Sequence, residues 1–109
     1  EDFNCALADT KIARTLHIDL EVPWFLDSFG IDRGAVLNLE AEQKFGRAKF
    51  VAHIPCSLKY AALGEQTVPR LQAVMEFGHG LFFNREEAGN DFLVDMANDN
   101  GYILTAMDW

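Results

Sequence analysis

Residues 16–22, Leu-His-Ile-Asp-Leu-Glu-Val, alternate between apolar and polar side chains without a break. In an extended chain, successive side chains point to opposite faces, so the apolar residues share one face and the polar residues share the other. This pattern predicts a half-buried β-strand. Pro23 follows directly and predicts the end of the strand, because proline has no backbone N–H to donate to a neighbouring strand.

Two further segments show the same alternation. Residues 35–42 and residues 48–54 each alternate between apolar and polar side chains over the length of a typical strand. Gly46 lies between them in the sequence Lys44-Phe45-Gly46-Arg47 and suits a tight reversal of the chain. We therefore expect residues 35–54 to form a β-hairpin.

Two segments carry apolar residues at helical spacing. Residues 2–16 have apolar side chains three and four residues apart, which predicts a helix. Thr67-Val68-Pro69 offers a capping threonine and a first-turn proline for a second helix. Its apolar stripe consists of Leu71, Val74, Met75, Gly78 and Phe82. We expect this helix to end or bend near His79, because Gly78 and Gly80 both weaken it.

The end of the chain predicts a second hairpin. Asp91–Ala97 and Gly101–Trp109 are β-rich, and the Asn100-Gly101 pair between them suits a primed hairpin turn. The expected order is therefore α-β-β-β-α-β-β, an α+β fold with an antiparallel sheet and helices on one face. The 109 residues are the usual size of one domain and contain no linker, so we expect a single domain over residues 1–109.

Composition and charge narrow the classes of function. The uncharged apolar runs are only a few residues long, which argues against a membrane-spanning segment. The formal net charge is −8, and such a chain repels phosphate backbones, so we expect no nucleic-acid partner. Cys5 and Cys56 belong to no CxxC pair. The sequence favours a cytoplasmic protein with free thiols, whereas a Cys5–Cys56 disulfide would indicate secretion.

No pattern in the sequence predicts catalysis or a bound metal. His17, Asp19 and Glu21 share a strand face and are potential metal ligands, but a solvated strand face already explains them. His53 and Cys56 are three residues apart, so on an extended strand they point to opposite faces. We expect neither a catalytic residue nor a cofactor.

The surplus of aromatic residues points instead to a protein partner. The chain has nine phenylalanines, two tryptophans and two tyrosines, and aromatic side chains beyond the capacity of a core tend to lie at interfaces. We expect the partner-binding residues to be Trp24, Phe25, Leu26 and Phe29. On the second predicted helix, Phe77, Leu81 and Phe83 lie off the apolar stripe and are the expected dimer interface.

Residues 69–107 resemble class I type III secretion chaperones. A helix from Pro69 to Met75 is followed by a polar stretch through Gly89. Phe92-Leu93-Val94-Asp95 and Gly101-Tyr102-Ile103-Leu104 then look like the closing hairpin of that family. The resemblance implies a cytoplasmic homodimer, used in virulence, that holds an extended effector segment on apolar patches without cofactor or catalysis. This chaperone-like function is our first expectation.

Two other classes of function stay open. Gly89-Asn90-Asp91-Phe92-Leu93-Val94-Asp95 is similar to a strand of SUKH-type immunity proteins. That resemblance implies an acidic inhibitor that neutralises a basic toxin or enzyme by charge complementarity. The third class is an α+β protein or enzyme that binds a small ligand, which requires an enclosed pocket.

Overall fold

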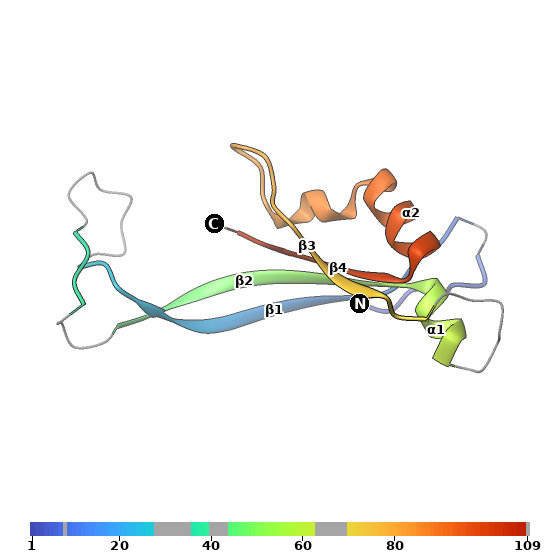
Figure 1. Ribbon diagram of the computed structural model, residues 1–109, viewed down its shortest axis with the longest axis horizontal. Coiled ribbons are helices and arrows are strands. Elements are labelled where there is room, and N and C mark those ends of the chain that lie inside the picture. Colours follow the sequence, from blue (N-terminus) through green and yellow to red (C-terminus); the bar gives the residue numbers. More distant parts are fainter. Residues whose placement is uncertain (8, 28–35, 40–43, 63–69, 109) are drawn as a thin grey trace.

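The computed structural model describes the whole chain except residues 8, 28–35, 40–43, 63–69 and 109 (Figure 1). The elements in chain order are the strands β1 (Ile12–Trp24) and β2 (Lys44–Pro55), the helix α1 (Cys56–Ala62), the strand β3 (Ala73–Phe77), the 3-10 helix η1 (Arg85–Gly89), the helix α2 (Asp91–Asn100) and the strand β4 (Tyr102–Met107). No helix of the described residues is long and apolar enough to cross a membrane.

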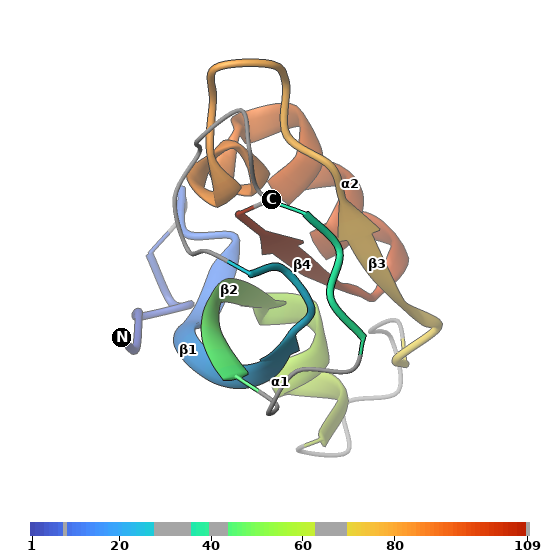
Figure 2. The same cartoon turned by 90° about the vertical axis from the view of Figure 1, so that its left-hand side faces the viewer.

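The four strands form one mixed sheet in the order β1-β2-β4-β3. β1 pairs antiparallel with β2 and β2 pairs antiparallel with β4, whereas β3 and β4 are parallel. β1 and β2 pair along nearly their whole length as a long ribbon, and β4 joins β2 only from Phe50 to His53, so the end of the ribbon that carries Trp24 and Lys44 projects beyond the sheet. The ribbon makes the molecule elongated, 54 × 26 × 21 Å, and Figure 2 shows how strongly its strands coil.

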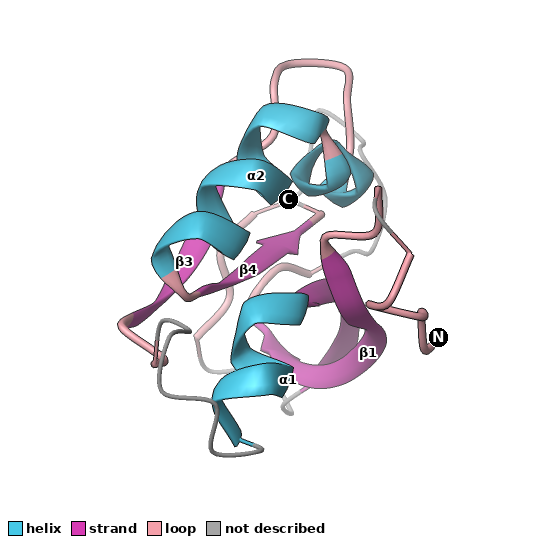
Figure 3. Ribbon diagram, turned by 90° about the vertical axis from the view of Figure 1, so that its right-hand side faces the viewer, coloured by secondary structure: helices cyan, strands magenta, loops and turns pink. Residues whose placement is uncertain are grey.

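The core lies between the helices η1 and α2 and one face of the sheet. Val51 pairs with Ala106 and packs with Ala88 of η1, and all three are fully buried. On α2, Leu93 and Ala97 pack on Leu104 of β4. Leu104 and Ala106 are two residues apart on one strand and therefore share a face. Figure 3 shows α2 lying along this side of the sheet, and α1 follows Pro55 at the end of β2.

A disulfide joins the N-terminal segment to the first residue of α1, directly after the end of β2. Cys5 and Cys56 are 51 positions apart in sequence and are bonded with a Cα–Cα distance of 5.6 Å. The segment before Cys5 runs along the outer side of β1, where the N–H of Phe3 donates to the carbonyl of Ala13 at 2.9 Å. The disulfide therefore helps to hold this segment, which forms an isolated bridge between Asp2 and Arg14, against the edge of the sheet.

The α+β class is confirmed, and three predicted strands coincide wholly or in large part with observed ones. Residues 16–22 are part of β1, residues 48–54 are part of β2, and β4 occupies most of the range Gly101–Trp109. The sheet is mixed, however, and the observed element order differs from α-β-β-β-α-β-β. β2 pairs with β1, and the described residues 36–39 of the predicted strand 35–42 contribute only the bridge between Leu37 and Leu26.

Three predicted elements are wrong. Residues 12–16 of the first predicted helix belong to β1, and Ala73–Phe77 of the second form β3, with Met75 and Phe77 turned to the core at strand spacing. Asp91–Ala97 is helical and not a strand, because Leu93, Val94 and Ala97 face the sheet from one side of α2. Gly101 caps this helix in the left-handed region, with φ 69°, where the sequence suggested a hairpin turn.

Candidate protein-binding surface

One face of the ribbon is apolar, with three exposed side chains on β1 and with half-buried or buried side chains on β2. In the pairing of β1 with β2, Leu16 lies opposite Ala52, Ile18 opposite Phe50 and Leu20 opposite Ala48. The helices η1 and α2 pack on the other face, beside Val51. Leu16, Ile18 and Leu20 consequently remain 38%, 36% and 45% exposed. The apolar ribbon face consists of Leu16, Ile18, Leu20, Val22, Trp24, Ala48, Phe50 and Ala52.

The opposite face of the ribbon is charged. Asp19 lies opposite Lys49, and Glu21 lies opposite Arg47. Arg47 also approaches Asp19, with 3.7 Å between Nη1 and Oδ2. Acidic residues of β1 therefore form one row and basic residues of β2 form the neighbouring row, an arrangement that stabilises the pairing of the two strands modestly. His17 precedes the acidic row on the same face.

β1 is an edge strand, and its backbone is partly unpaired among the described residues. The N–H of Thr15 donates to the carbonyl of Glu1 at 2.8 Å, and the terminal ammonium of Glu1 donates to the carbonyl of Thr15 at 2.7 Å. The backbone groups of Thr15 thus point outward. Because alternate residues of an antiparallel strand share an edge, those of His17, Asp19 and Glu21 point outward as well.

Three of the four predicted partner-binding residues lie at the far end of the ribbon. Trp24 is half-buried as the last residue of β1, and its indole lies over Gly46, where an added Cβ would be 2.8 Å from the ring. Phe25 is 48% exposed, and Leu26 is half-buried and bridges to Leu37. Phe29 lies outside the described residues. Trp24 continues the apolar ribbon face, so this part of the predicted set adjoins the larger surface.

The predicted dimer residues do not share a helix. Phe77 belongs to β3, is half-buried and packs against both core clusters. Leu81 and Phe83 lie in the loop between β3 and η1 and are 73% and 64% exposed. The N–H of Phe83 donates to the carbonyl of Gly80 at 3.0 Å, which closes a turn with Phe82 at its tip. Only Leu81 and Phe83 of the predicted set are therefore available to a partner.

His53 is the one buried histidine among the described residues. Its Nδ1 lies 2.9 Å from the hydroxyl of Thr15, and its Nε2 has no hydrogen-bond partner in the described part of the chain. Burial lowers the pKa of His53, because the charged imidazolium is costly to desolvate. Cys56 is held in the disulfide, so its sulfur is not a thiol nucleophile.

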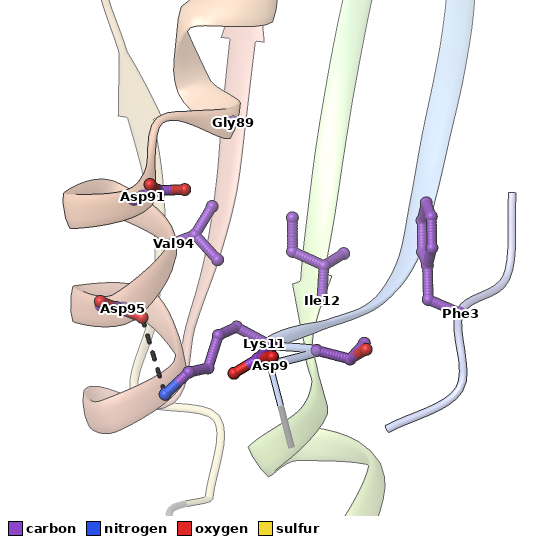
Figure 4. A pocket seen from close by; sticks show the side chains of 9 residues that line it. Phe3, Asp9, Lys11, Ile12, Gly89, Asp91, Val94 and Asp95 are labelled. Atoms are coloured by element: carbon purple, nitrogen blue, oxygen red, sulfur yellow. Dashed lines mark ion pairs between the residues drawn. The ribbon is translucent and has the colours of Figure 1, made fainter. Parts of the chain in front are cut away.

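A hollow of about 530 Å³ lies between the N-terminal segment and α2 (Figure 4). It is lined by Phe3, Asp9, Thr10, Lys11, Ile12, Gly89, Asp91, Val94 and Asp95. The Nζ of Lys11 lies 3.7 Å from Oδ1 of Asp95, a pair that is largely exposed. The two other aspartates leave the hollow with an excess of negative charge. The described residues contain no group of three or more His, Cys, Asp or Glu side chains that is arranged to hold a metal ion.

The sequence identified the apolar row of β1 but not its exposure. Alternation shows that Leu16, Ile18 and Leu20 share a face, yet it does not show what covers that face.

Searches with protein-family models, among curated proteins and among solved structures found no match to this chain.

Proposed function

We propose that this chain is a non-enzymatic protein-binding domain that holds an extended segment of a partner protein on the apolar ribbon face. The observation that carries the proposal is the exposure of Leu16, Ile18 and Leu20 along one side of a projecting two-stranded ribbon. Burying apolar surface is worth about 25 cal/mol per Å², so covering a continuous row of such side chains favours binding. Exposed apolar side chains that lie side by side are typical of protein-interaction sites.

The chaperone-like interpretation agrees with this geometry. A row of exposed apolar side chains offers an extended segment apolar contacts along its length, and such contacts need no cofactor. We also propose that the chain forms a homodimer. The contact between the two copies is the loop of Leu81, Phe82 and Phe83, in which Phe82 is 96% exposed. Sedimentation at several concentrations checks this assignment, since Leu81→Asp should convert a dimer to a monomer if the loop forms the contact.

We further propose that the chain functions in an oxidising compartment. A disulfide between Cys5 and Cys56 persists outside the reducing cytosol, and secretion is the location that this pairing favours. Alkylation of free thiols in intact cells that make the protein tests this proposal. Isolated protein that is alkylated at both Cys5 and Cys56 would contradict the oxidising compartment and indicate the cytoplasm.

An acidic inhibitor is the second candidate function. It is favoured by the hollow between the N-terminal segment and α2, which carries Asp9, Asp91 and Asp95 against Lys11 alone. Such a surface complements a folded, basic partner. Binding to such a partner would weaken steeply with ionic strength and would depend on Asp91, whereas binding of an extended segment depends on Ile18 and Leu20.

A random peptide library displayed on phage, selected on the disulfide-bonded protein, tests the first proposal. We expect selected peptides to lose binding to the double variant Ile18→Asp with Leu20→Asp. Phe92→Asp is the matched control, because Phe92 is 67% exposed but lies on α2. Recovery of no peptide, or of peptides that bind both variants equally well, would contradict the proposal.

A further inference from the structure

We propose that the hollow between the N-terminal segment and α2 binds one arginine side chain of a basic partner protein. This inference rests on the second candidate function, the acidic inhibitor, and names the group of the partner that the hollow receives. It follows from three features of the hollow: carboxylates without a cation, apolar side chains beside them, and a buried histidine nitrogen that has no partner. The volume of about 530 Å³ lies in the range of ligand-binding pockets.

Two of the three aspartates that line the hollow have no cationic partner. The Nζ of Lys11 lies 3.7 Å from Oδ1 of Asp95, so one positive charge is already placed beside that carboxylate. Asp9 and Asp91 form no ion pair or side-chain hydrogen bond with any other described residue. Asp91 and Asp95 are four positions apart on α2, and like charges at this spacing repel each other. An incoming cation would remove this repulsion.

The spacing of Asp91 and Asp95 suits a guanidinium group better than an ammonium group. Side chains four positions apart on a helix have their Cβ atoms about 5–6 Å apart. The planar guanidinium of arginine carries its N–H donors in a fixed fork and can donate to two carboxylates at once. The ammonium of lysine is a compact point charge without this spread. The pair of carboxylates therefore selects arginine.

Apolar side chains in the hollow offer a surface for the stem of the arginine. Figure 4 shows Phe3 on one side of the hollow, Asp91 and Val94 of α2 on the other, and Ile12 between them. Phe3 is 41% exposed. The methylene groups of arginine pack along apolar surface while the charged end contacts polar groups, and a guanidinium also packs favourably on an aromatic ring. The hollow thus combines the apolar and the anionic contacts that one arginine side chain makes.

A buried imidazole nitrogen lies beside Gly89, which lines the hollow. His53 is 7% exposed, and its Nε2 has no hydrogen-bond partner among the described residues. A Cβ added to Gly89 would lie 3.8 Å from this nitrogen and within 4 Å of no other atom beyond the neighbouring residues of the chain. Nδ1 of the same ring lies 2.9 Å from the hydroxyl of Thr15, and when Nδ1 donates to that hydroxyl, Nε2 is an acceptor. Nε2 is therefore available to an N–H group that enters beside Gly89.

Titration of the disulfide-bonded protein with blocked amino acids, followed by heteronuclear NMR, tests the inference. N-acetyl-arginine-amide should shift the amide signals of Asp91 and Asp95 and bind with a Kd of about 1 mM, the affinity expected for a ligand of this size. N-acetyl-citrulline-amide, its uncharged isostere, should bind about tenfold more weakly, because it offers no charge-assisted hydrogen bonds. N-acetyl-lysine-amide should also bind more weakly. Equal binding of all three, or shifts confined to residues outside the hollow, would overturn the inference.

Two variants on α2 separate the hollow from the general charge of the protein. Asp91→Asn removes one carboxylate from the hollow and should weaken the binding of N-acetyl-arginine-amide about threefold to fivefold. Asp99→Asn is the matched control, because Asp99 is exposed on the same helix but does not line the hollow. It changes the net charge equally and should leave the binding nearly unchanged. Equal weakening in the two variants would show a general effect of charge and overturn the inference.

The imidazole of His53 provides a separate readout in the same titration. N-acetyl-arginine-amide should shift the Nε2 resonance of His53, because Nε2 gains a hydrogen-bond donor. Gly89→Ala should weaken the binding, because the added Cβ takes up the space beside Nε2. An Nε2 resonance that stays unchanged at saturation would place the arginine elsewhere and overturn the inference.

The remaining outcomes distinguish the source of the arginine and separate this inference from the proposed functions. Free arginine that binds about tenfold tighter than N-acetyl-arginine-amide would assign the hollow to a small molecule and overturn the partner side chain. A basic protein whose binding depends on Asp91 but on none of its own arginines would overturn the inference and leave the acidic inhibitor standing. Failure of the arginine derivative, while library peptides still bind the apolar ribbon face, overturns this inference and leaves the first proposal standing.

Discussion

Removing the Cys5–Cys56 disulfide should strongly destabilise the folded chain. The disulfide joins residues 51 positions apart, and cross-linking a loop of that length removes conformational entropy from the unfolded chain. The chain-entropy relation gives a loss of about 4 kcal/mol in the free energy of unfolding, within the 2–5 kcal/mol found when small domains lose a native disulfide. The replacement itself costs little at Cys5, which is half-exposed.

The assay is urea unfolding of the double variant Cys5→Ala with Cys56→Ala, followed by far-ultraviolet circular dichroism. With a slope of about 2 kcal/mol per molar urea, the midpoint should fall by about 2 M. Wild-type protein unfolded in excess dithiothreitol is the control and should show nearly the same midpoint. A shift worth less than about 1 kcal/mol would refute the reasoning, because the cross-link would then restrict the unfolded chain far less than its loop length predicts.

Three further predictions follow from single positions. Gly101→Ala should lower the free energy of unfolding, measured by thermal unfolding, by about 1 kcal/mol, because Gly101 has φ 69°. Gly78→Ala is the control and should lower it less, because an added Cβ there meets nothing within 4 Å. Equal losses in the two variants would contradict the assigned cap. Gly46→Ala should lower the free energy of unfolding by about 1–3 kcal/mol and change the fluorescence of Trp24, because the added Cβ would lie 2.8 Å from the Trp24 ring. Unchanged emission would count against that contact. Burial lowers the pKa of His53 below its ordinary value of 6.5, so as the pH falls the imidazole is protonated in the unfolded chain before it is protonated in the folded chain. The free energy of unfolding should therefore decline as the pH falls from about 6.5 to the pKa of His53 in the folded chain. A His53→Gln variant that kept this part of the pH profile would show that another group causes it.

Strands with strict alternation could be predicted from the sequence. Residues 16–22 and 48–54 repeat with a period of two, which helices do not share, and both lie in strands. Asp91–Ala97 was ambiguous, since a short apolar stretch with Leu93 and Val94 fits either structure. Asn100-Gly101 added to the error, because the left-handed conformation that suits a hairpin turn is also the one that ends a helix.

The location of the candidate surface depended on tertiary structure. The apolar row from Leu16 to Leu20 is visible in the sequence, but only the placement of η1 and α2 on the opposite face shows that it stays open. The pairing of β1 with β2, and with it the acidic row beside the basic row, brings together residues about thirty positions apart. Leu81 and Phe83 were selected as residues off a helical stripe, and they are exposed because they lie in a loop.

The most direct test of the central claim is a methyl nuclear magnetic resonance titration of the disulfide-bonded protein with a library-selected peptide. The account predicts that the methyl signals of Leu16, Ile18 and Leu20 shift together and saturate, while those of the buried Leu93 and Leu104 move little. Shifts confined to other parts of the molecule, with Leu16, Ile18 and Leu20 unchanged at saturation, would contradict it.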